Sequence, residues 1–282
     1  MENIHFSAET VIGAIAQGFI GVMLPIVLIV AWKLKTKAKL VPFWVGCLVF
    51  PVFAFIIEGS AALGITLIDK YTLGILTKPL PLYLFSAAMA GIFEETGRLI
   101  GMKTLMRKYK DKRDGITYGI GHGGIESIII VGGASFLTLF IAFLTNTGML
   151  DTVTAQYSPA LKEMFITNLK AMTGGRFADY ILAGFERVSA IILHVSLSVI
   201  VFTGVRIKGR LCHYPLAVFL HFAADCTVIL VHVFGMPLWL FEIIFFAASV
   251  AVAVPTVIYY LRLPQILGEE TAAPIQSDIQ AQ

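Results

Sequence analysis

Long apolar stretches are the feature that most constrains the fold of this 282-residue chain. A helix needs about 20 largely apolar residues to cross a bilayer. Seven stretches reach that length, at residues 10–32, 41–68, 80–102, 116–143, 177–205, 214–234 and 237–261. Hydrophobic residues make up 57% of the chain and charged residues 14%, against about 45–50% and about 25% in soluble domains. This composition excludes a soluble protein, so we expect an all-α, polytopic membrane protein with about seven transmembrane helices.

Basic residues are concentrated in alternate loops between these stretches. The loops at residues 33–39, 103–113 and 206–210, together with Arg262, hold most of the 21 lysines and arginines. Short loops rich in Lys and Arg stay in the cytoplasm. We therefore expect the N-terminus outside and the C-terminus in the cytoplasm, in a multi-pass protein of the cell membrane.

Ionisable side chains at similar depth occur within four of the predicted spans. Such groups are costly in hydrocarbon, so each is a functional-site hypothesis by default. They are Glu94, Glu95 and Arg98 in the third span, His122 and Glu126 in the fourth, His194 in the fifth, and His221 and Asp225 in the sixth. Other polar residues lie deeper or near the outer face, and we assign them to packing or ion pairing: Glu58, Glu186, Arg187, His232 and Glu242.

The depth of the histidines and carboxylates predicts that they meet. With a rise of about 1.5 Å per residue, they lie roughly 10–18 Å from the cytoplasmic edge of their spans. One layer in the cytoplasmic half of the membrane would therefore hold groups from four helices. We expect these groups to surround a single water-accessible cavity that opens toward the cytoplasmic leaflet.

Two His and carboxylate pairs have helical spacing. His122 and Glu126 are four residues apart, as are His221 and Asp225, so each pair lies on one helix face. A carboxylate beside a histidine can orient its ring. The glycines at positions 121, 123 and 124 leave room for another helix or a substrate to approach. Either pair taken alone is compatible with helix packing.

Glu94, Glu95 and Arg98 lie within about one helical turn. Arg98 is four residues after Glu94 and three after Glu95, so it can offset the charge of one of them. Two adjacent carboxylates beside one arginine suggest different roles, one paired and structural, the other a base. A helix end close to a basic loop explains the same residues without chemistry, and this alternative stays open.

Together, these residues resemble a superfamily of intramembrane proteases. The Glu-Glu-x-x-Arg motif at residues 94–98, a histidine on the next helix and the His-x-x-x-Asp motif at residues 221–225 follow the motif order of the CAAX-protease and PrsW families. The Gly-His-Gly-Gly-x-Glu motif at residues 121–126 and the isolated His194 resemble the YhfC family of intramembrane metalloproteases.

The resemblance covers the last five predicted spans and implies a division of the chain into three parts. Residues 1–79 would form two additional N-terminal spans, and residues 80–262 a five-span, catalytic-like core. Residues 263–282 are rich in Gly, Ala, Gln and Ser, so we expect a disordered cytoplasmic tail. A short helix at residues 158–172 begins with Ser-Pro, which favours a helix start, and we expect it on the outer surface.

The resemblance also implies roles for the polar residues. Glu94 or Glu95 would be the general base that activates a water, with the first glutamate the better candidate. His122 and His194 would bind a metal or assist that water, while His221 and Asp225 would hold the metal or stabilise the oxyanion. The implied catalytic set is Glu94, Glu95, Arg98, His122, His221 and Asp225, and the implied metal ligands are His122, Glu126, His194 and His221.

The cofactor and substrate stay open at this point. Zn²⁺ suits a set of histidines and carboxylates, but the same residues could hydrolyse a peptide without a metal. CAAX proteases have one more residue before the arginine and usually Asn in place of Asp225, so their prenylated substrates are not transferred to this chain. We expect membrane lipid and a peptide or membrane-protein substrate as partners, and no nucleic acid.

The predicted function is that of an intramembrane peptidase that hydrolyses a peptide bond with a Glu-activated water. A proton- or ion-coupled transporter is the main alternative, because embedded Glu, His and Arg residues also form proton relays. The sequence shows no inverted repeat that would favour it. A non-catalytic membrane scaffold of the same superfamily is the other alternative.

The predicted orientation can be tested with reporter fusions. A reporter fused after Lys39, Lys110 or Lys208 should be cytoplasmic, and one fused after Lys78 or Lys162 should be external, because the basic loops stay inside. Enzymatic activity of phosphatase and fluorescent-protein fusions measures both locations. An external Lys110 fusion would invert the orientation.

Overall fold

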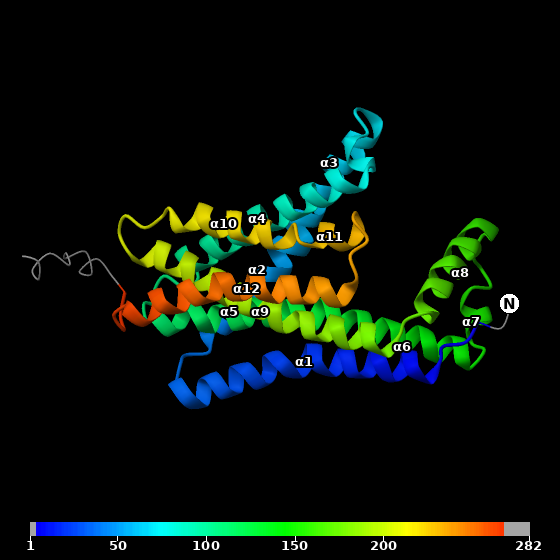
Figure 1. Ribbon diagram of the computed structural model, residues 1–282, viewed down its shortest axis with the longest axis horizontal. Coiled ribbons are helices and arrows are strands. Elements are labelled where there is room, and N and C mark those ends of the chain that lie inside the picture. The colour runs from blue at the N-terminus through cyan, green and yellow to red at the C-terminus, as the bar shows by residue number, and fades with distance from the viewer. Residues whose placement is uncertain (1–3, 268–282) are drawn as a thin grey trace, which may run out of the picture.

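The computed structural model describes residues 4–267, and helices form nearly all of its regular structure. The long helices α1 (Ala8–Thr36), α9 (Phe177–Arg206) and α12 (Leu238–Arg262) run along the long axis of the molecule (Figure 1). The prediction of an all-α protein is confirmed for these residues.

Six continuous helical segments in residues 4–267 are long and apolar enough to cross a membrane. They are Ala8–Thr36, Val41–Tyr71, Lys112–Asn146, Phe177–Arg206, His213–His232 and Leu238–Arg262. The polytopic membrane character of the chain is thereby confirmed. The remaining predicted span, α4 (Pro79–Lys103), is a helix of 25 residues that is not among the six, and its second half carries four charged residues. The count of seven spans and the orientation of the termini stay predictions.

Three of the spans are not one regular α-helix along their whole length. The first comprises α2 (Val41–Phe50), the π-helical η1 (Pro51–Glu58) and α3 (Gly59–Tyr71), and Pro51 marks the change because proline lacks the backbone N–H of a regular helix. The second comprises α5 (Lys112–Ser127), the π-helical η3 (Ile128–Gly132) and α6 (Gly133–Asn146). The third is divided into α10 (His213–Asp225) and α11 (Val228–His232). Short elements complete the described chain: η2 (Ile75–Thr77), α7 (Leu150–Val153) and α8 (Pro159–Thr173).

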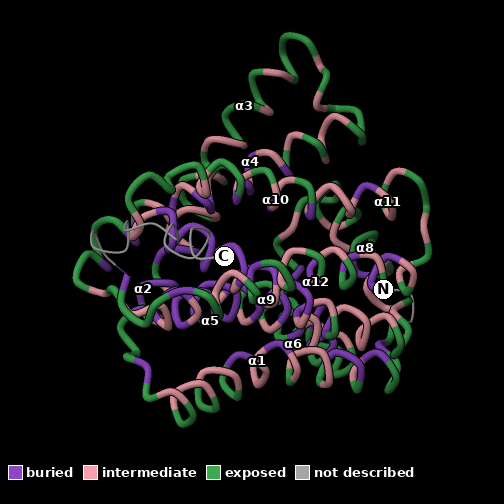
Figure 2. Tube along the Cα trace, turned by 60° about the vertical axis from the view of Figure 1, so that its left-hand side comes forward, coloured by how far each residue is buried: buried purple, intermediate pink, exposed green. Residues whose placement is uncertain are grey.

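Helix α9 forms the centre of the bundle (Figure 2), and 78% of the residues in its apolar 18-residue stretch are buried. Its second half packs into an apolar core that includes side chains from α4, α5 and α10. We call the following residues of this core, each at most 1% exposed, the packed layer: Met102, Met106, Tyr118, Leu197, Val201, Phe202 and Ala217. The packed layer lies close to the ends of the helices that join the basic loops.

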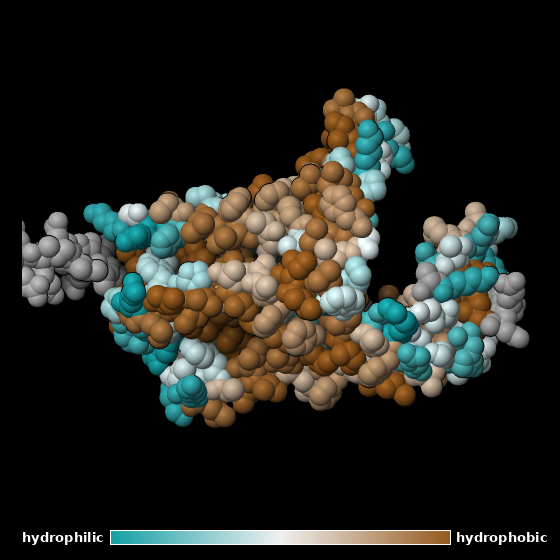
Figure 3. Space-filling model, viewed as in Figure 1, coloured by the Kyte–Doolittle hydropathy of each residue, from teal (hydrophilic) through white to brown (hydrophobic). Residues whose placement is uncertain are grey.

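The surface is apolar along the middle of the bundle and polar at its two ends (Figure 3). The loops at residues 33–39, 103–113 and 206–210 meet at one end, on the left in Figure 1, which we call the basic end. Arg206 donates hydrogen bonds there to the backbone carbonyls of Met102, Met106 and Tyr109. Helix α8 and the tip of α3 lie at the opposite end.

The first residues of the predicted tail are ordered against the loop before α5. Asp111 and Ile266 form an antiparallel bridge, the Leu267 N–H donates to the Lys110 carbonyl at 2.8 Å, and Leu267 is fully buried. The expectation of disorder from residue 263 is therefore wrong for residues 263–267. Residues 268–282 lie outside the described residues.

The predicted short helix is present as α8. The Ser158 hydroxyl accepts a hydrogen bond from the Leu161 N–H, and Pro159 occupies the first turn, as the Ser-Pro start predicts. Its position on a membrane surface stays a prediction.

Glycines allow the closest helix contact in the bundle. A Cβ on Gly121 of α5 would lie 2.0 Å from the Phe43 carbonyl oxygen of α2, so only glycine fits. Helix packing, and not a substrate, explains the glycine at this position.

Replacing this glycine should separate α2 from α5. We expect Gly121→Ala to lower the stability of the purified protein by about 1–3 kcal/mol, because the extra methyl has no space. Gly133→Ala is the matched control, since its Cβ would meet nothing within 4 Å. Thermal unfolding in detergent measures both variants, and equal midpoints would contradict the close approach.

Candidate active site

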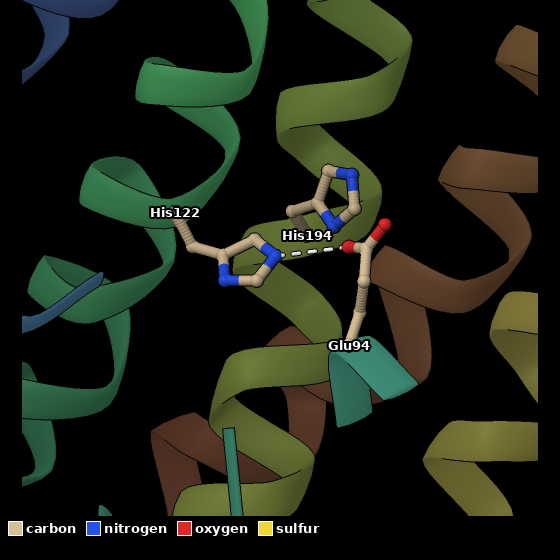
Figure 4. Close-up of side chains that lie close together, drawn as sticks. All are labelled: Glu94, His122 and His194. Atoms are coloured by element: carbon tan, nitrogen blue, oxygen red, sulfur yellow. Dashed lines mark hydrogen bonds and ion pairs between the residues drawn. The ribbon is translucent and has the colours of Figure 1, made fainter. Parts of the chain in front are cut away.

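Four helices bring the predicted polar residues together inside the bundle. Helix α4 supplies Glu94, α5 supplies His122 and α9 supplies His194, whose side chains converge in Figure 4. Helix α10 adds His221, which is 2% exposed. Groups from four separate helices share one site, as the depth argument expected, and their depth in a membrane stays a prediction.

Glu94 and His122 form the first contact of the site. His122 Nε2 lies 3.0 Å from Glu94 Oε2, and this nitrogen donates the hydrogen bond when it carries the proton. The second carboxylate oxygen of Glu94 points away from His122 (Figure 4). His122 Nδ1 is buried and has no hydrogen-bond partner among the described residues. Glu94 can therefore contact His122 with Oε2 while Oε1 stays available for a second group.

Arg98 connects the other glutamate of the motif to His194. Its guanidinium forms a buried ion pair with Glu95 and contacts His194 Nδ1. A guanidinium can only donate, so His194 Nδ1 is the acceptor and the ring proton is on Nε2. Nε2 in turn contacts the Glu126 carboxylate. Of the two adjacent glutamates, Glu95 is therefore paired with the arginine, while Glu94 contacts a histidine.

His221 is held by two carboxylates. Its Nδ1 lies 2.8 Å from Glu95 Oε1, and its Nε2 lies 3.5 Å from Asp225 Oδ2. Because a carboxylate accepts, Nδ1 carries the proton in the neutral ring. The pair formed by His221 and Asp225 was predicted from their spacing, and the structure brings both to the same cavity.

Glu126 does not have the partner that its spacing predicts. Its carboxylate contacts His194 and accepts a hydrogen bond from Arg187 at 3.0 Å. Arg187 also forms an ion pair with Glu186 on the same helix. Sequence reasoning assigned Glu186 and Arg187 to ion pairing, which is confirmed, but it missed that both line the site. Their depth, closer to the opposite end than the other groups, gave no reason to include them.

The side-chain donors that could hold a metal differ from the predicted set. Among the described residues, one donor atom each from Glu94, His122 and His194 lies within 4.8 Å of the other two, and all three residues are buried. This group includes two of the predicted ligands. Glu126 and His221 are outside it, and they contact Arg187 and Glu95.

This donor group fits a divalent ion in its chemistry. Two imidazoles and one carboxylate are a common protein ligand set for zinc with an open position. His194 uses both ring nitrogens on Arg98 and Glu126 here, so it must release one of them to bind a metal. A buried group of two histidines and a glutamate can thus hold a metal ion.

A cavity of about 110 Å³ connects these groups. Polar and apolar side chains line it together: Glu94, Glu126, Glu186, Arg187, Ala190, Leu193, His194, His221, Asp225, Val228, Phe241 and Phe245. The predicted single cavity is therefore present. Five of the predicted site residues line it next to Arg187, namely Glu94, Glu126, His194, His221 and Asp225, whereas Glu95, Arg98 and His122 do not.

Comparison with known proteins identifies the family. Residues 20–245 match the YhfC intramembrane metalloprotease family. The chain belongs to this family. It is 33% identical over 200 residues to the uncharacterized membrane protein YhfC of Bacillus subtilis, and the match covers 71% of this chain and 77% of that protein. No solved structure matches the chain.

The family match confirms the resemblance and extends it. It begins at residue 20, within the first span, so it includes most of the region at residues 1–79 that we expected to lie outside the core. The structure gives a reason, because α2 approaches α5 next to His122. The two N-terminal spans thus pack against the helix that carries His122.

Removing Arg98 should destabilise this YhfC-family protein strongly. Arg98→Met leaves buried Glu95 without its counter-charge, and breaking a buried ion pair costs about 3–5 kcal/mol. Arg176→Met is the matched control, because the Arg176–Asp179 pair is exposed and has the same spacing of three residues. Unfolding in detergent compares the two variants, and a similar small effect of both would contradict this role of Arg98.

Proposed function

We propose that this chain is an intramembrane peptidase in which Glu94 activates the water that attacks the peptide bond. The contact between Glu94 and His122 at one wall of an internal cavity carries this proposal. Glu94 belongs to the donor group and lines the cavity. Glu95, by contrast, is fully buried and paired with Arg98. The two adjacent carboxylates therefore have different roles.

The reaction needs a base for the water and a proton for the leaving amine. Glu94 Oε1 would take the proton as the water oxygen bonds to the carbonyl carbon, and would return it to the amine nitrogen as the C–N bond breaks. His122 would hold Oε2 during both steps. In this scheme one carboxylate is sufficient for the transfer of the proton.

A metal would add electrostatic assistance. A bound zinc ion would be held by His122, His194 and one carboxylate oxygen of Glu94, in place of the direct contact between Glu94 and His122, and the other oxygen of Glu94 would stay the base. The ion would lower the pKa of a water and polarise the carbonyl oxygen. Arg98 and Glu126 orient His194 from two sides. Their contribution is to fix the ring, as outer partners of metal ligands commonly do.

His221 would act on the developing charge. Its neutral ring donates through Nδ1 to Glu95, so Nε2 can stabilise an oxyanion only when the ring is protonated. Asp225, whose carboxylate lies 3.5 Å from Nε2, is the counter-charge for that protonated ring. The pair is therefore suited to share a proton during the reaction.

Cleavage of fluorescence-quenched peptide libraries by the purified protein in detergent tests the proposal. We expect Glu94→Gln to lower the rate by about 10²–10⁴-fold, the usual cost of losing a general base. Glu242→Gln should retain activity, because this buried α12 carboxylate does not line the cavity. Folding of each variant is checked by thermal unfolding. Unchanged turnover in Glu94→Gln would contradict the proposal.

The metal can be tested separately from turnover. Bound zinc in the purified protein should be stoichiometric in the wild type and lost in a His122→Ala/His194→Ala variant. Elemental analysis measures it without a substrate. Proton or ion flux in proteoliposomes that persists without any peptidase activity would instead favour the transporter, and the absence of both would favour a scaffold.

A further inference from the structure

The cavity has a deep end and an exposed end. At the deep end the side chains of His194 and His221 are 4% and 3% exposed. At the other end the side chains of Glu186 and Asp225 are 24% and 31% exposed. The exposed end is therefore where a ligand can enter from outside the protein.

The exposed end lies away from the basic end. Along α9, His194 is about 18 Å and Glu186 about 30 Å from Arg206, where the helix reaches the basic loop. Phe241 and Phe245 line the cavity from the first turns of α12, which begins at the opposite end of the bundle. The cavity thus extends from the donor group toward the opposite end.

No comparable path leads to the basic end within the described residues. The packed layer separates the donor group from the basic loops, and its members are at most 1% exposed. Tyr118 lies one helical turn from His122, and Leu197 lies three residues from His194. Both are fully buried. The cavity thus lies on the other side of the donor group from the packed layer, whereas the sequence led us to expect an opening toward the cytoplasmic leaflet, on the side of the basic loops.

The break between α10 and α11 shapes the exposed end. Helix α10 ends at Asp225 and α11 begins at Val228, and both residues line the cavity. The opposite wall is α12, where the rings of Phe241 and Phe245 are stacked 5.8 Å apart. The entrance therefore lies between α9, the α10–α11 break and α12.

We infer that the substrate is an extended polypeptide segment that enters from the end opposite the basic loops, between the α10–α11 break and α12. This inference rests on the proposed function. A cavity of about 110 Å³ admits a side chain and its adjoining backbone, whereas an intact helix is about 10–12 Å wide. If the basic loops are cytoplasmic, the substrate segment lies in the outer half of the membrane or beyond it.

Cysteine labelling from each side of the membrane tests the route without any substrate. Val228→Cys, in a variant with Ser at positions 47, 212 and 226, places a thiol at the entrance. Native Cys212, kept alone in a second variant, is an exposed thiol in the loop at the basic end. A charged, membrane-impermeant methanethiosulfonate reagent is added to sealed vesicles of both orientations.

We expect the two thiols to react from opposite sides, each at least tenfold faster from its own side. Ala217→Cys in the packed layer is the control for the closed end and should stay unmodified from both sides. Labelling of Val228→Cys from the same side as Cys212, or from neither side, overturns the inference. So does labelling of Ala217→Cys from the basic side.

Turnover distinguishes failure of the route from failure of the peptidase. In a preparation that cleaves the peptide library, a bulky adduct on Val228→Cys should reduce cleavage at least tenfold, and the same adduct on Cys212 should not. Opposite-side labelling in a preparation without any cleavage supports the route and contradicts the peptidase. Full cleavage by the Val228→Cys adduct contradicts the route while the peptidase stands.

Discussion

The charge of Arg98, buried in the middle of a membrane protein, is the constraint on which the site depends. A cation in this environment needs partners, and Arg98 has Glu95 on its own helix and His194 on α9. These contacts hold the ring of His194 in place and offset the charge of Glu95. Glu94 is thereby left to contact His122 and the cavity. One ion pair thus gives two adjacent glutamates different surroundings.

Much of this arrangement follows from the sequence because hydropathy and depth are one-dimensional properties. The spans and the common layer of Glu94, His122, His194 and His221 were predicted from residue counts alone, and the structure brings these groups together. The partner of Glu126 was not predictable. Spacing predicts contacts along one helix, whereas Glu126 contacts Arg187 on another helix. The rotation of α5 against α9, which brings these two residues together, is not encoded in any local pattern.

The direction of the cavity was also beyond the sequence, for a related reason. Depth places the donor group nearer the basic loops, and this position suggested an entrance on that side. Access depends instead on which side chains fill the space, and Phe202 and Tyr118 are buried on that side. The break at Asp225 leaves the other side open. A site can therefore lie nearer one end of the bundle while its cavity extends toward the other end.

The bridge between Asp111 and Ile266 has a consequence for how the protein is made. Its two residues are separated by more than half of the chain, including α5, α9 and α12. The loop before α5, which includes the N-cap of the helix that carries His122, can be fastened only after the last helix has left the ribosome. The contact that fastens this loop therefore forms only after α12 has been synthesised, later than the helices that carry Glu94, His122 and His194.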